Sequence, residues 1–214
     1  NVLVDPKTGI ANNGAVSVVD PEKKIQTKVI EVGLHPSGMA LSPDRKFLYI
    51  ACANSDEIFV ISTETDEVVD KISVHMLDGI PFGSGPGDLT VSPDGKYLFV
   101  ANGTENSICV IDIGAQKEVA GLIPTGWYPA SVRIAGDRIL VANGKGMTSL
   151  PNPYGPNPAR SGDVVIHHEG GREQVVKVQY IGGGLFRGTM SIISTPDERT
   201  LGLYSKAVYA NTPY

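Results

Sequence analysis

The sequence has few of the residues that disulfide frameworks and metal centres need. Its 214 residues include two cysteines, one tryptophan and four histidines. Cys52 and Cys109 both stand among strand-forming residues, which favours two small buried side chains over a redox pair. The histidines are dispersed and stand at no usual metal-ligand spacing. We therefore expect no metal site and no cofactor in this chain.

Long apolar runs and clusters of positive charge are also lacking. No segment approaches the roughly 18 consecutive apolar residues that indicate a membrane-spanning helix, so we expect no membrane span. The formal net charge is -5 and no basic run occurs, so nucleic acid is not an expected partner. No signal peptide is visible, and the chain begins within a strand pattern at residues 1–4. We interpret it as a piece of a longer protein.

Catalytic signatures are absent from the sequence as well. There is no Gly-x-Ser-x-Gly motif for a serine nucleophile, and no cysteine has an evident histidine partner. Most carboxylates fall in predicted turns, as Asp44, Asp94 and Glu118 do. We therefore predict no catalytic site within this chain.

The sequence does contain a repeat, which is plainest in residues 86–126. Four short runs in this stretch alternate apolar and other residues, around Leu89, Leu98, Ile108 and Val119. Each run is rich in β-branched or aromatic residues and is bounded by turn residues, which predicts four antiparallel strands. The turn between the first two reads Ser-Pro-Asp-Gly, the composition of a tight turn.

Neighbouring stretches repeat this unit. Residues 36–62 align with residues 86–112 without a gap, and a further copy begins at Trp127. One four-stranded sheet cannot bury both of its faces alone, so units of four strands at this period indicate a β-propeller. We predict an all-β fold, with propeller blades of four antiparallel strands over residues 1–194.

The predicted blades are not all complete. The first, at residues 1–33, lacks its first strand. Two full blades follow at about residues 34–84 and 85–126. A fourth covers residues 127–183, with a long interruption between its second and third strands; its third strand is expected at residues 163–167 and its fourth at residues 174–181. Residues 188–193 form one more strand.

Residues 195–214 change to helical periodicity. Leu201 and Tyr204 are spaced by three, and Val208 follows four residues later, which predicts a short C-terminal helix. Thr195 is the expected N-cap, with Glu198 three residues on in a capping-box arrangement. We interpret this segment as a helix and linker that lead to a further domain.

The predicted long loops all fall on one rim of the propeller. They are insertions at residues 6–14, 75–85, 126–129 and 143–162, whereas the opposite rim has short turns. Long loops on a rigid scaffold often bind ligands or partners, although tolerated surface insertions would give the same pattern. The candidate binding residues on this rim are Trp127, Tyr128, Asn102, Asn143, Lys145, Tyr154 and His35.

Some of these residues have a second interpretation. Trp127 and Tyr128 suit contact with a ligand or another domain, but they would also suit packing between adjacent blades. The segment around Lys145 offers a cation and backbone amides to an anion, but it lacks the rest of a phosphate-loop pattern. Asp88 and Ser131 occupy equivalent positions in the innermost strand, where they could line the central channel.

Two segments resemble a known repeat at their second strand. Phe99-Val100-Ala101-Asn102 and Leu140-Val141-Ala142-Asn143 stand where the YVTN-type repeat of bacterial surface-layer-like β-propellers has Tyr-Val-Thr-Asn. The second blade departs from the pattern, with Cys52 at the Asn position. The resemblance covers about residues 14–182. Propellers of this family usually have seven blades, so it implies that about four blades here are part of a seven-bladed ring. The alternative is that residues 188–193 complete the first blade and close a four-bladed ring.

Five ordered motifs in the second half of the chain carry a narrower resemblance. They read PTGWYP at 124–129, VANGKG at 141–146, PNPYGPNP at 151–158, GTMSII at 188–193 and VYANTPY at 208–214. Together they are similar to bacterial two-part proteins in which a YVTN-type propeller precedes an alkaline-phosphatase-like phosphoesterase domain. The resemblance implies an exported protein, periplasmic or at the cell surface. It also implies that the metal ligands and the Ser/Thr nucleophile belong to the phosphoesterase domain and not to this chain.

Three functions are compatible with these observations. The first is a non-catalytic propeller that acts as scaffold and binding module for an attached or adjacent phosphoesterase domain, which would contact the long-loop rim. The second is a stand-alone surface or periplasmic interaction module. The third is a redox subunit, because similar propellers occur in quinoprotein dehydrogenases and copper reductases. The missing propeller blades are a further possible partner.

Overall fold

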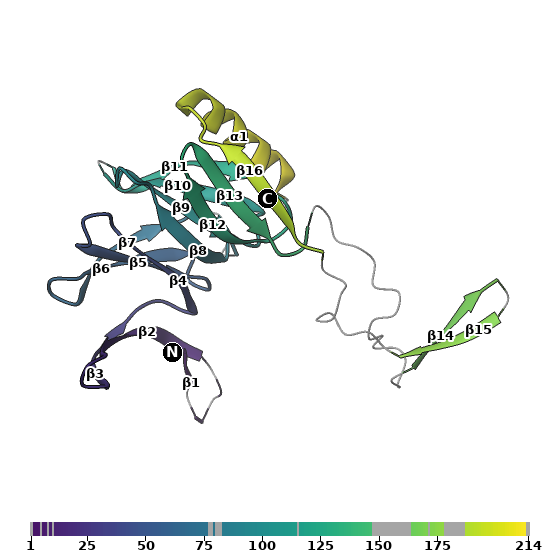
Figure 1. Ribbon diagram of the computed structural model, residues 1–214, viewed down its shortest axis with the longest axis horizontal. Coiled ribbons are helices and arrows are strands. Elements are labelled where there is room, and N and C mark those ends of the chain that lie inside the picture. Colours follow the sequence, from purple (N-terminus) through teal and green to yellow (C-terminus); the bar gives the residue numbers. More distant parts are fainter. Residues whose placement is uncertain are drawn as a thin grey trace.

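The computed structural model describes residues 2–4, 6–7, 9, 11–76, 79, 83–114, 116–146, 164–170, 172–177 and 187–212. Within these residues, antiparallel sheets follow one another along the chain, and the sheets formed by residues 2–143 and 189–194 stand side by side (Figure 1). The prediction of an all-β, partial β-propeller with four-stranded antiparallel blades and a short C-terminal helix is confirmed.

The first three sheets follow the predicted blade pattern, and each strand pairs with its neighbour in the chain. The first sheet consists of β1 (Val2–Val4), β2 (Ala11–Asp20) and β3 (Ile25–Glu31). The second consists of β4 (Pro36–Leu41), β5 (Phe47–Cys52), β6 (Glu57–Ser62) and β7 (Glu67–Ser73). The third consists of β8 (Pro86–Val91), β9 (Tyr97–Asn102), β10 (Ser107–Asp112) and β11 (Glu118–Pro124). Among the described residues, the first sheet has no counterpart of β4 and β8.

The second strand of each complete blade is apolar at nearly every position because it is covered on both faces. Successive side chains of a strand point to opposite faces. In β5, Tyr49 and Ala51 pack toward the third sheet, whereas Ile50 and Cys52 pack toward the first. An alternating pattern with one polar face would leave polar groups buried between two blades.

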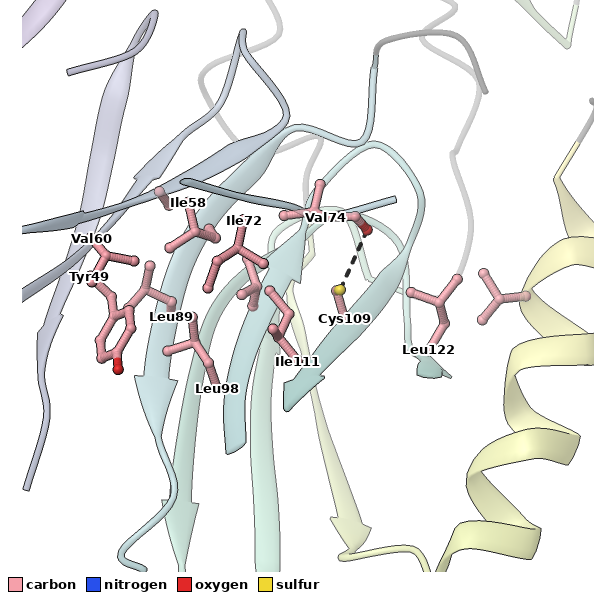
Figure 2. Packing of buried hydrophobic residues seen from close by; sticks show 13 residues of the cluster. Tyr49, Ile58, Val60, Ile72, Val74, Leu89, Leu98, Cys109, Ile111 and Leu122 are labelled. Atoms are coloured by element: carbon pink, nitrogen blue, oxygen red, sulfur yellow. Dashed lines mark hydrogen bonds between the residues drawn. The ribbon is translucent and has the colours of Figure 1, made fainter. Parts of the chain in front are cut away.

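Clusters of apolar side chains fill the spaces between adjacent sheets. Figure 2 shows the cluster between the second and third sheets, in which Ile58 packs with Leu98 and Ile111. Cys109 lies in this cluster and its thiol donates a hydrogen bond to the carbonyl oxygen of Val74, with 3.4 Å between the two atoms. Each side chain of this size contributes about 1.5–3 kcal/mol when fully buried, so these clusters hold the blades together.

The fourth sheet differs from the prediction in its third strand. Its strands are β12 (Pro129–Ala135), β13 (Arg138–Asn143) and β16 (Thr189–Ser194). The segments that we expected as its third and fourth strands instead form a separate two-stranded sheet of β14 (Val164–Glu169) and β15 (Arg172–Lys177).

β16 takes the third position because its apolar face fits the existing core. Ile193 pairs with Ile139 across the ladder, and both pack into the cluster between the third and fourth sheets. The prediction that residues 188–193 are a strand is confirmed. The alternative in which this strand completes the first blade and closes a four-bladed ring is wrong, because β16 pairs with β13 and not with β1.

The C-terminal helix, α1 (Glu198–Asn211), packs across β11 (Figure 1). Leu201 and Tyr204 contact the cluster between the third and fourth sheets, and Val208 lies in the cluster between the second and third. The expected N-cap was wrong: Asp197 caps the helix and accepts a 2.7 Å hydrogen bond from the Thr200 amide. No helix in the described part of the chain is long and apolar enough to cross a membrane.

Thr195 is not the cap because its polar groups bind elsewhere. Its amide and its hydroxyl both donate to the carbonyl oxygen of Asp137, at 2.8 and 3.0 Å. These bonds fix the segment before α1 to the turn between β12 and β13. The Asp197 side chain, two residues later, is then free to accept from the first turn of the helix, where a negative charge is favourable.

Apolar side chains are uncovered at two places in the row of sheets. Met39 of β4 is 57% exposed, whereas its equivalents Leu89 and Val132 are buried between blades. Met39 pairs with Ile50, which packs toward the first sheet, and that sheet has no innermost strand among the described residues to cover Met39. On the last sheet of the row, Met190 and Ile192 of β16 are 64% and 59% exposed.

Candidate functional site

The long-loop rim is where the second strand of each blade ends and the first strand of the next begins. We call it the loop rim. Its described residues are 6–7, 9, 32–35, 53–56, 74–76, 79, 83–85, 103–106, 125–128 and 144–146.

Asp56 holds the loop rim between the second and third sheets. Its carboxylate accepts hydrogen bonds from the amides of Gly83 at 2.6 Å, Ser84 at 3.2 Å and Gly85 at 3.0 Å. The Nε2 atom of His75 lies 3.2 Å from the same carboxylate. Asp56 is 2% exposed, so these charge-assisted bonds are shielded from water and fix the start of β8 firmly.

Asn106 is the equivalent of Asp56, 50 positions later, and holds the next loop. Both residues have positive φ, 51° for Asp56 and 55° for Asn106, a conformation that Asp and Asn adopt more readily than most residues. The side-chain oxygen of Asn106 accepts a 2.8 Å hydrogen bond from the amide of Tyr128. Its carbonyl oxygen accepts from the amide of Thr125 at 2.9 Å. The same turn position therefore orients the beginning of the following blade in both cases.

Glu105 lies beside Asn106 and is surrounded by neutral donors. Its carboxylate accepts from the hydroxyl of Ser84 at 2.6 Å, the amide nitrogen of Asn102 at 2.9 Å and the hydroxyl of Ser107 at 3.3 Å. Within the described part of the chain, no Lys, Arg or His forms an ion pair with it. The negative charge of Glu105 is therefore held in place without a neighbouring positive charge.

Trp127 and Tyr128 are fixed by a short antiparallel pairing with residues 144–146. The Trp127 amide donates to the Gly146 carbonyl oxygen at 2.6 Å, and the Lys145 amide donates to the Trp127 carbonyl oxygen at 3.0 Å. The Gly144 amide donates to the Tyr128 carbonyl oxygen at 2.8 Å. The two aromatic residues consequently sit on backbone that is paired on one side and held by Asn106 on the other.

The Tyr128 ring lies between a glycine and a cation. A Cβ atom on Gly103 would lie 3.2 Å from the ring, so the ring rests directly on that backbone. The Lys145 ammonium lies 4.7 Å from the ring centroid, within the range of a cation–π interaction. Tyr128 is 40% exposed. The loop rim thus presents a positioned aromatic and a positive charge to solvent.

A pocket of about 180 Å³ opens beside this pair, between the loop rim and the end of α1. It is lined by Glu105, Asn106, Pro124, Thr125, Gly126, Trp127, Val208 and Asn211. The structure therefore places Trp127, Tyr128 and Lys145 near one another and sets Trp127 in the wall of a pocket with a carboxylate.

The other predicted site residues lie elsewhere. Asn102 and Asn143 are buried, 0% and 2% exposed, and their amide nitrogens bond to Glu105 and to Ser191 within the protein. The side-chain oxygens of both asparagines are buried without a hydrogen-bond partner. His35 is exposed where β4 begins and has φ of 54°. Tyr154 lies outside the described residues.

Asp88 does not simply line a channel, since it joins the innermost strands of two blades. Its carboxylate accepts from the Ser131 hydroxyl at 2.7 Å, the Val132 amide at 3.0 Å and the Arg133 guanidinium at 2.6 Å. These three donors belong to β12, so the residue ties the third sheet to the fourth.

The two cysteines are buried and unpaired. Burial raises the pKa of the Cys52 thiol to about 11 and that of the Cys109 thiol well above its usual range. Neither thiol therefore has the low pKa of a reactive nucleophile. Among the residues that the structure describes, no three His, Cys, Asp or Glu side chains gather into a possible metal site.

The sequence prediction missed the side chains that position this rim. Asp56, Asn106 and Glu105 were not among the predicted site residues. A signal for two of them was present, because Asp56 and Asn106 align in the repeat at a turn where positive φ favours Asp or Asn. No pattern pointed to Glu105, whose partners Ser84 and Asn102 come from different loops and strands.

A comparison with known protein families gives one match. The sequence model described as "Lactonase, 7-bladed beta-propeller" matches residues 39–148. The chain belongs to this seven-bladed β-propeller lactonase family. No curated protein matches the chain. In this lactonase-family propeller, the matched residues begin within β4 and extend past the end of β13. They include Trp127, Tyr128 and Lys145 of the loop rim.

Solved structures agree with this assignment of the fold. Hydrazine synthase of Kuenenia stuttgartiensis matches with a TM-score of 0.53 and 29% identity, over 61% of this chain and 36% of that one. A protein of unknown function from Desulfotomaculum acetoxidans matches with a TM-score of 0.52 and 19% identity, over 67% and 48%. A candidate 6-phosphogluconolactonase from Bacteroides uniformis matches with a TM-score of 0.50 and 20% identity, over 84% and 51%.

These matches also allow the length of this lactonase-family chain to be compared with the lengths of the solved structures. The chain spans between about a third and half of the length of the structures that it matches. The last two likenesses, below 25% identity, concern the fold alone.

Proposed function

We propose that this chain is a binding and scaffold part of a larger propeller, and that the loop rim is its binding face. The observation that carries this proposal is the Tyr128–Lys145 pair: Tyr128 is 40% exposed, yet its ring contacts Lys145 and Gly103 and its backbone is held by Asn106 and Gly144. Binding surfaces are enriched in aromatic residues that need little further ordering when a partner docks.

The roles of the other polar side chains support binding over catalysis. Asp56 and Asn106 use their acceptors to hold loops, and Glu105 uses its acceptors to join Ser84, Asn102 and Ser107. A catalytic base would need an oxygen available to take a proton from substrate, whereas a carboxylate whose oxygens are already hydrogen-bonded still attracts a cation through its charge. We accordingly propose that chemistry, where the whole protein performs any, belongs to another part of it.

We further propose that the partner is an alkaline-phosphatase-like phosphoesterase domain in an exported protein. The support is the set of five ordered motifs, of which PTGWYP at 124–129 and VANGKG at 141–146 form the paired segment of the loop rim. The docked domain would lie over Trp127, Tyr128 and Lys145. We propose accordingly that the protein is periplasmic or at the cell surface.

Uncovered apolar side chains support a second element of the proposal. Met39 is exposed where the first sheet, as far as the structure describes it, has no innermost strand, and Met190 and Ile192 are exposed on the last sheet of the row. We propose that the innermost strand of the first blade covers Met39 and that further blades of the same ring cover Met190 and Ile192, which agrees with a seven-bladed family and with the partial coverage of its relatives.

A lactonase is the second candidate, and the family match is the observation that favours it. A lactonase would need catalytic residues for lactone hydrolysis within this propeller, whereas the leading proposal assigns no catalytic residue to this chain. The two candidates are separated by whether the chain itself turns over substrate, a measurement described at the end of the Discussion.

The docking proposal is tested with a matched pair of tyrosines on opposite rims. Tyr128 on the loop rim is 40% exposed, and Tyr97, which begins β9 at the short-turn rim, is 38% exposed. In the protein that carries the phosphoesterase domain, we expect Tyr128→Ala to make the junction between the domains more accessible to limited proteolysis. Tyr97→Ala should leave proteolysis unchanged. Equal behaviour of both variants would contradict docking at this rim and favour a stand-alone module.

A further inference from the structure

The pocket beside Trp127 combines three features, each of which attracts a positively charged group. The first is the Glu105 carboxylate, which lines it and has no ion-pair partner among the described residues. Burial raises the pKa of the nearby Tyr209 phenol, and the Glu105 charge raises it further. Val208 and Asn211 of α1 line the same pocket, so the Glu105 carboxylate lies close to the end of that helix.

The second feature is the end of α1. A helix carries a partial negative charge at its C-terminus because its last carbonyl groups lack intrahelical partners. Val208 and Asn211, which lie in the last turn, line the pocket. The last turn contains no basic residue, so no side chain of the helix itself offsets this charge.

The third feature is aromatic. Trp127, the single tryptophan of the chain, is part of the pocket wall, and the face of an indole attracts cations more strongly than other aromatic side chains do. None of the lining residues is Lys, Arg or His. Lys145, a cation on this rim, lies instead over the Tyr128 ring.

We propose that this pocket binds an organic cation, an alkylammonium or guanidinium group. Its volume of about 180 Å³ resembles that of an engineered cavity of about 150 Å³ that takes a benzene-sized molecule, so a small cationic group fits. A metal ion suits it less well, because Glu105 is the one carboxylate among the lining residues and hard metal ions require several oxygen ligands. The bound group is either a free amine or the side chain of a Lys or Arg residue presented by a protein.

This inference does not depend on the phosphoesterase proposal. Cation binding is measured by titration of the pocket in this chain, whereas docking is measured by limited proteolysis of the Tyr128 and Tyr97 variants. A pocket that binds no cation would leave the docking result standing, and a failed docking experiment would leave the pocket result standing.

The fluorescence of Trp127 reports occupancy directly, since no other tryptophan contributes. The 214-residue chain is titrated with tetramethylammonium, ethylammonium and methylguanidinium chlorides, with sodium chloride at equal ionic strength and neutral tert-butanol as references. We expect saturable change with the organic cations and none with the references. Equal responses to tert-butanol and tetramethylammonium would overturn the proposal.

Two substitutions connect the response to this pocket. Glu105→Gln keeps the shape of the side chain and removes the charge, and it should weaken binding about tenfold. Glu118→Gln, an exposed glutamate at the start of β11, removes the same charge elsewhere and should have no effect. Binding that is unchanged in Glu105→Gln would overturn the proposal. Circular dichroism verifies that each variant is folded.

A second pair keeps the test decisive if Glu105→Gln does not fold. Asn211→Lys places an ammonium group at the exposed end of α1 beside the pocket and should block titration by added cations. Ala210→Lys adds the same charge to the adjacent exposed residue, which does not line the pocket, and should leave binding intact. Equal binding by both variants would overturn the proposal.

One further arm distinguishes the two sources of the cation. The peptides acetyl-Gly-Lys-Gly-amide and acetyl-Gly-Arg-Gly-amide are titrated beside ethylammonium and methylguanidinium. Tighter binding of a peptide supports a side chain presented by a protein, and tighter binding of the free amine supports a small-molecule ligand. If neither class saturates, the proposal is wrong.

Discussion

The hydroxyl of Ser205 in α1 accepts a 2.9 Å hydrogen bond from the backbone amide of Leu122 in β11, 83 residues earlier. β11 is the outermost strand of its sheet, so this amide points away from the ladder. An uncovered strand edge is a template for pairing with other chains. The helix therefore gives part of that edge a partner and covers it with Leu201 and Val208.

Removal of this hydroxyl should destabilise the fold. Ser205→Ala leaves the Leu122 amide without its partner at a buried position, and we expect a loss of about 1–3 kcal/mol in the free energy of unfolding. Urea denaturation followed by circular dichroism measures it. Lys206→Ala, at the exposed neighbouring residue, is the control. Equal stability of the two variants would mean that α1 does not supply the edge of β11 with a needed hydrogen bond.

Two glycines with different surroundings should respond in opposite directions to the same substitution. A Cβ atom on Gly38 would lie 2.7 Å from the Asp88 Cα atom and 2.8 Å from the Gly87 carbonyl oxygen, both backbone atoms. Gly38→Ala should therefore lower the midpoint of thermal unfolding, with a cost of about 1–3 kcal/mol. Gly202→Ala, in α1 with no atom within 4 Å, should raise stability by about 0.5–1 kcal/mol. A neutral Gly38→Ala would show that the innermost strands are not in close contact.

Asp56 should be more sensitive to loss of its charge than a similar turn residue. Asp56→Asn keeps a residue type suited to positive φ but replaces one of the two carboxylate oxygens with an NH₂ group. One oxygen accepts from the amides of Gly83 and Ser84 and the other from the amide of Gly85, so at least one of these bonds is lost. We expect a cost of about 2–3 kcal/mol. Asp66 also has positive φ, 53°, and Asp66→Asn serves as the matched control. Hydrogen exchange of the Gly85 amide should accelerate in Asp56→Asn alone, and unchanged exchange there would rule out this role.

The buried thiols should make the protein less stable in alkali. Burial raises the pKa of Cys52 from about 9 to about 11 in the folded state. Below about pH 9 the thiol is protonated in both states and has no effect. Between about pH 9 and about pH 11 the unfolded chain loses this proton while the folded chain keeps it, so stability falls as the pH rises, by about 2–3 kcal/mol in all.

This fall is measured by urea denaturation over the alkaline range. Cys52→Ala should have lower stability near neutral pH, because a buried side chain is shortened, and a shallower fall above pH 9. Cys109 shifts in the same direction, so part of the slope should remain. A slope identical to that of the unsubstituted chain would show that Cys52 ionises freely in the folded state.

The blades could be predicted from the sequence because their signals are local and repeated. Alternation of apolar residues, the Ser-Pro-Asp-Gly turn and the gapless alignment of residues 36–62 with 86–112 were enough to place β4 to β13. Pairing between strands that are far apart in the sequence could not be predicted in the same way. Residues 163–167 and 188–193 both have strand patterns, and periodicity alone cannot choose which pairs with β13.

The same distinction applies to the candidate site. Trp127, Tyr128 and Lys145 could be found because they stand on predicted long loops, and the structure brings them together. Asn102 and Asn143 end their strands on the same rim, but the strand alternation turns their side chains into the protein. Glu105 could not be singled out, because its significance comes from Ser84 and from the end of α1, which are distant in sequence.

The central claim is that this chain binds and does not catalyse, and a hydrolysis assay tests it most directly. The purified 214-residue chain is incubated with 6-phosphogluconolactone and, separately, with p-nitrophenyl phosphate in the presence of zinc. Our account predicts rates equal to those of spontaneous hydrolysis for both compounds. Turnover above that rate that is abolished by one substitution in this chain, such as Glu105→Gln, would contradict the account; turnover of the lactone alone would establish the lactonase alternative.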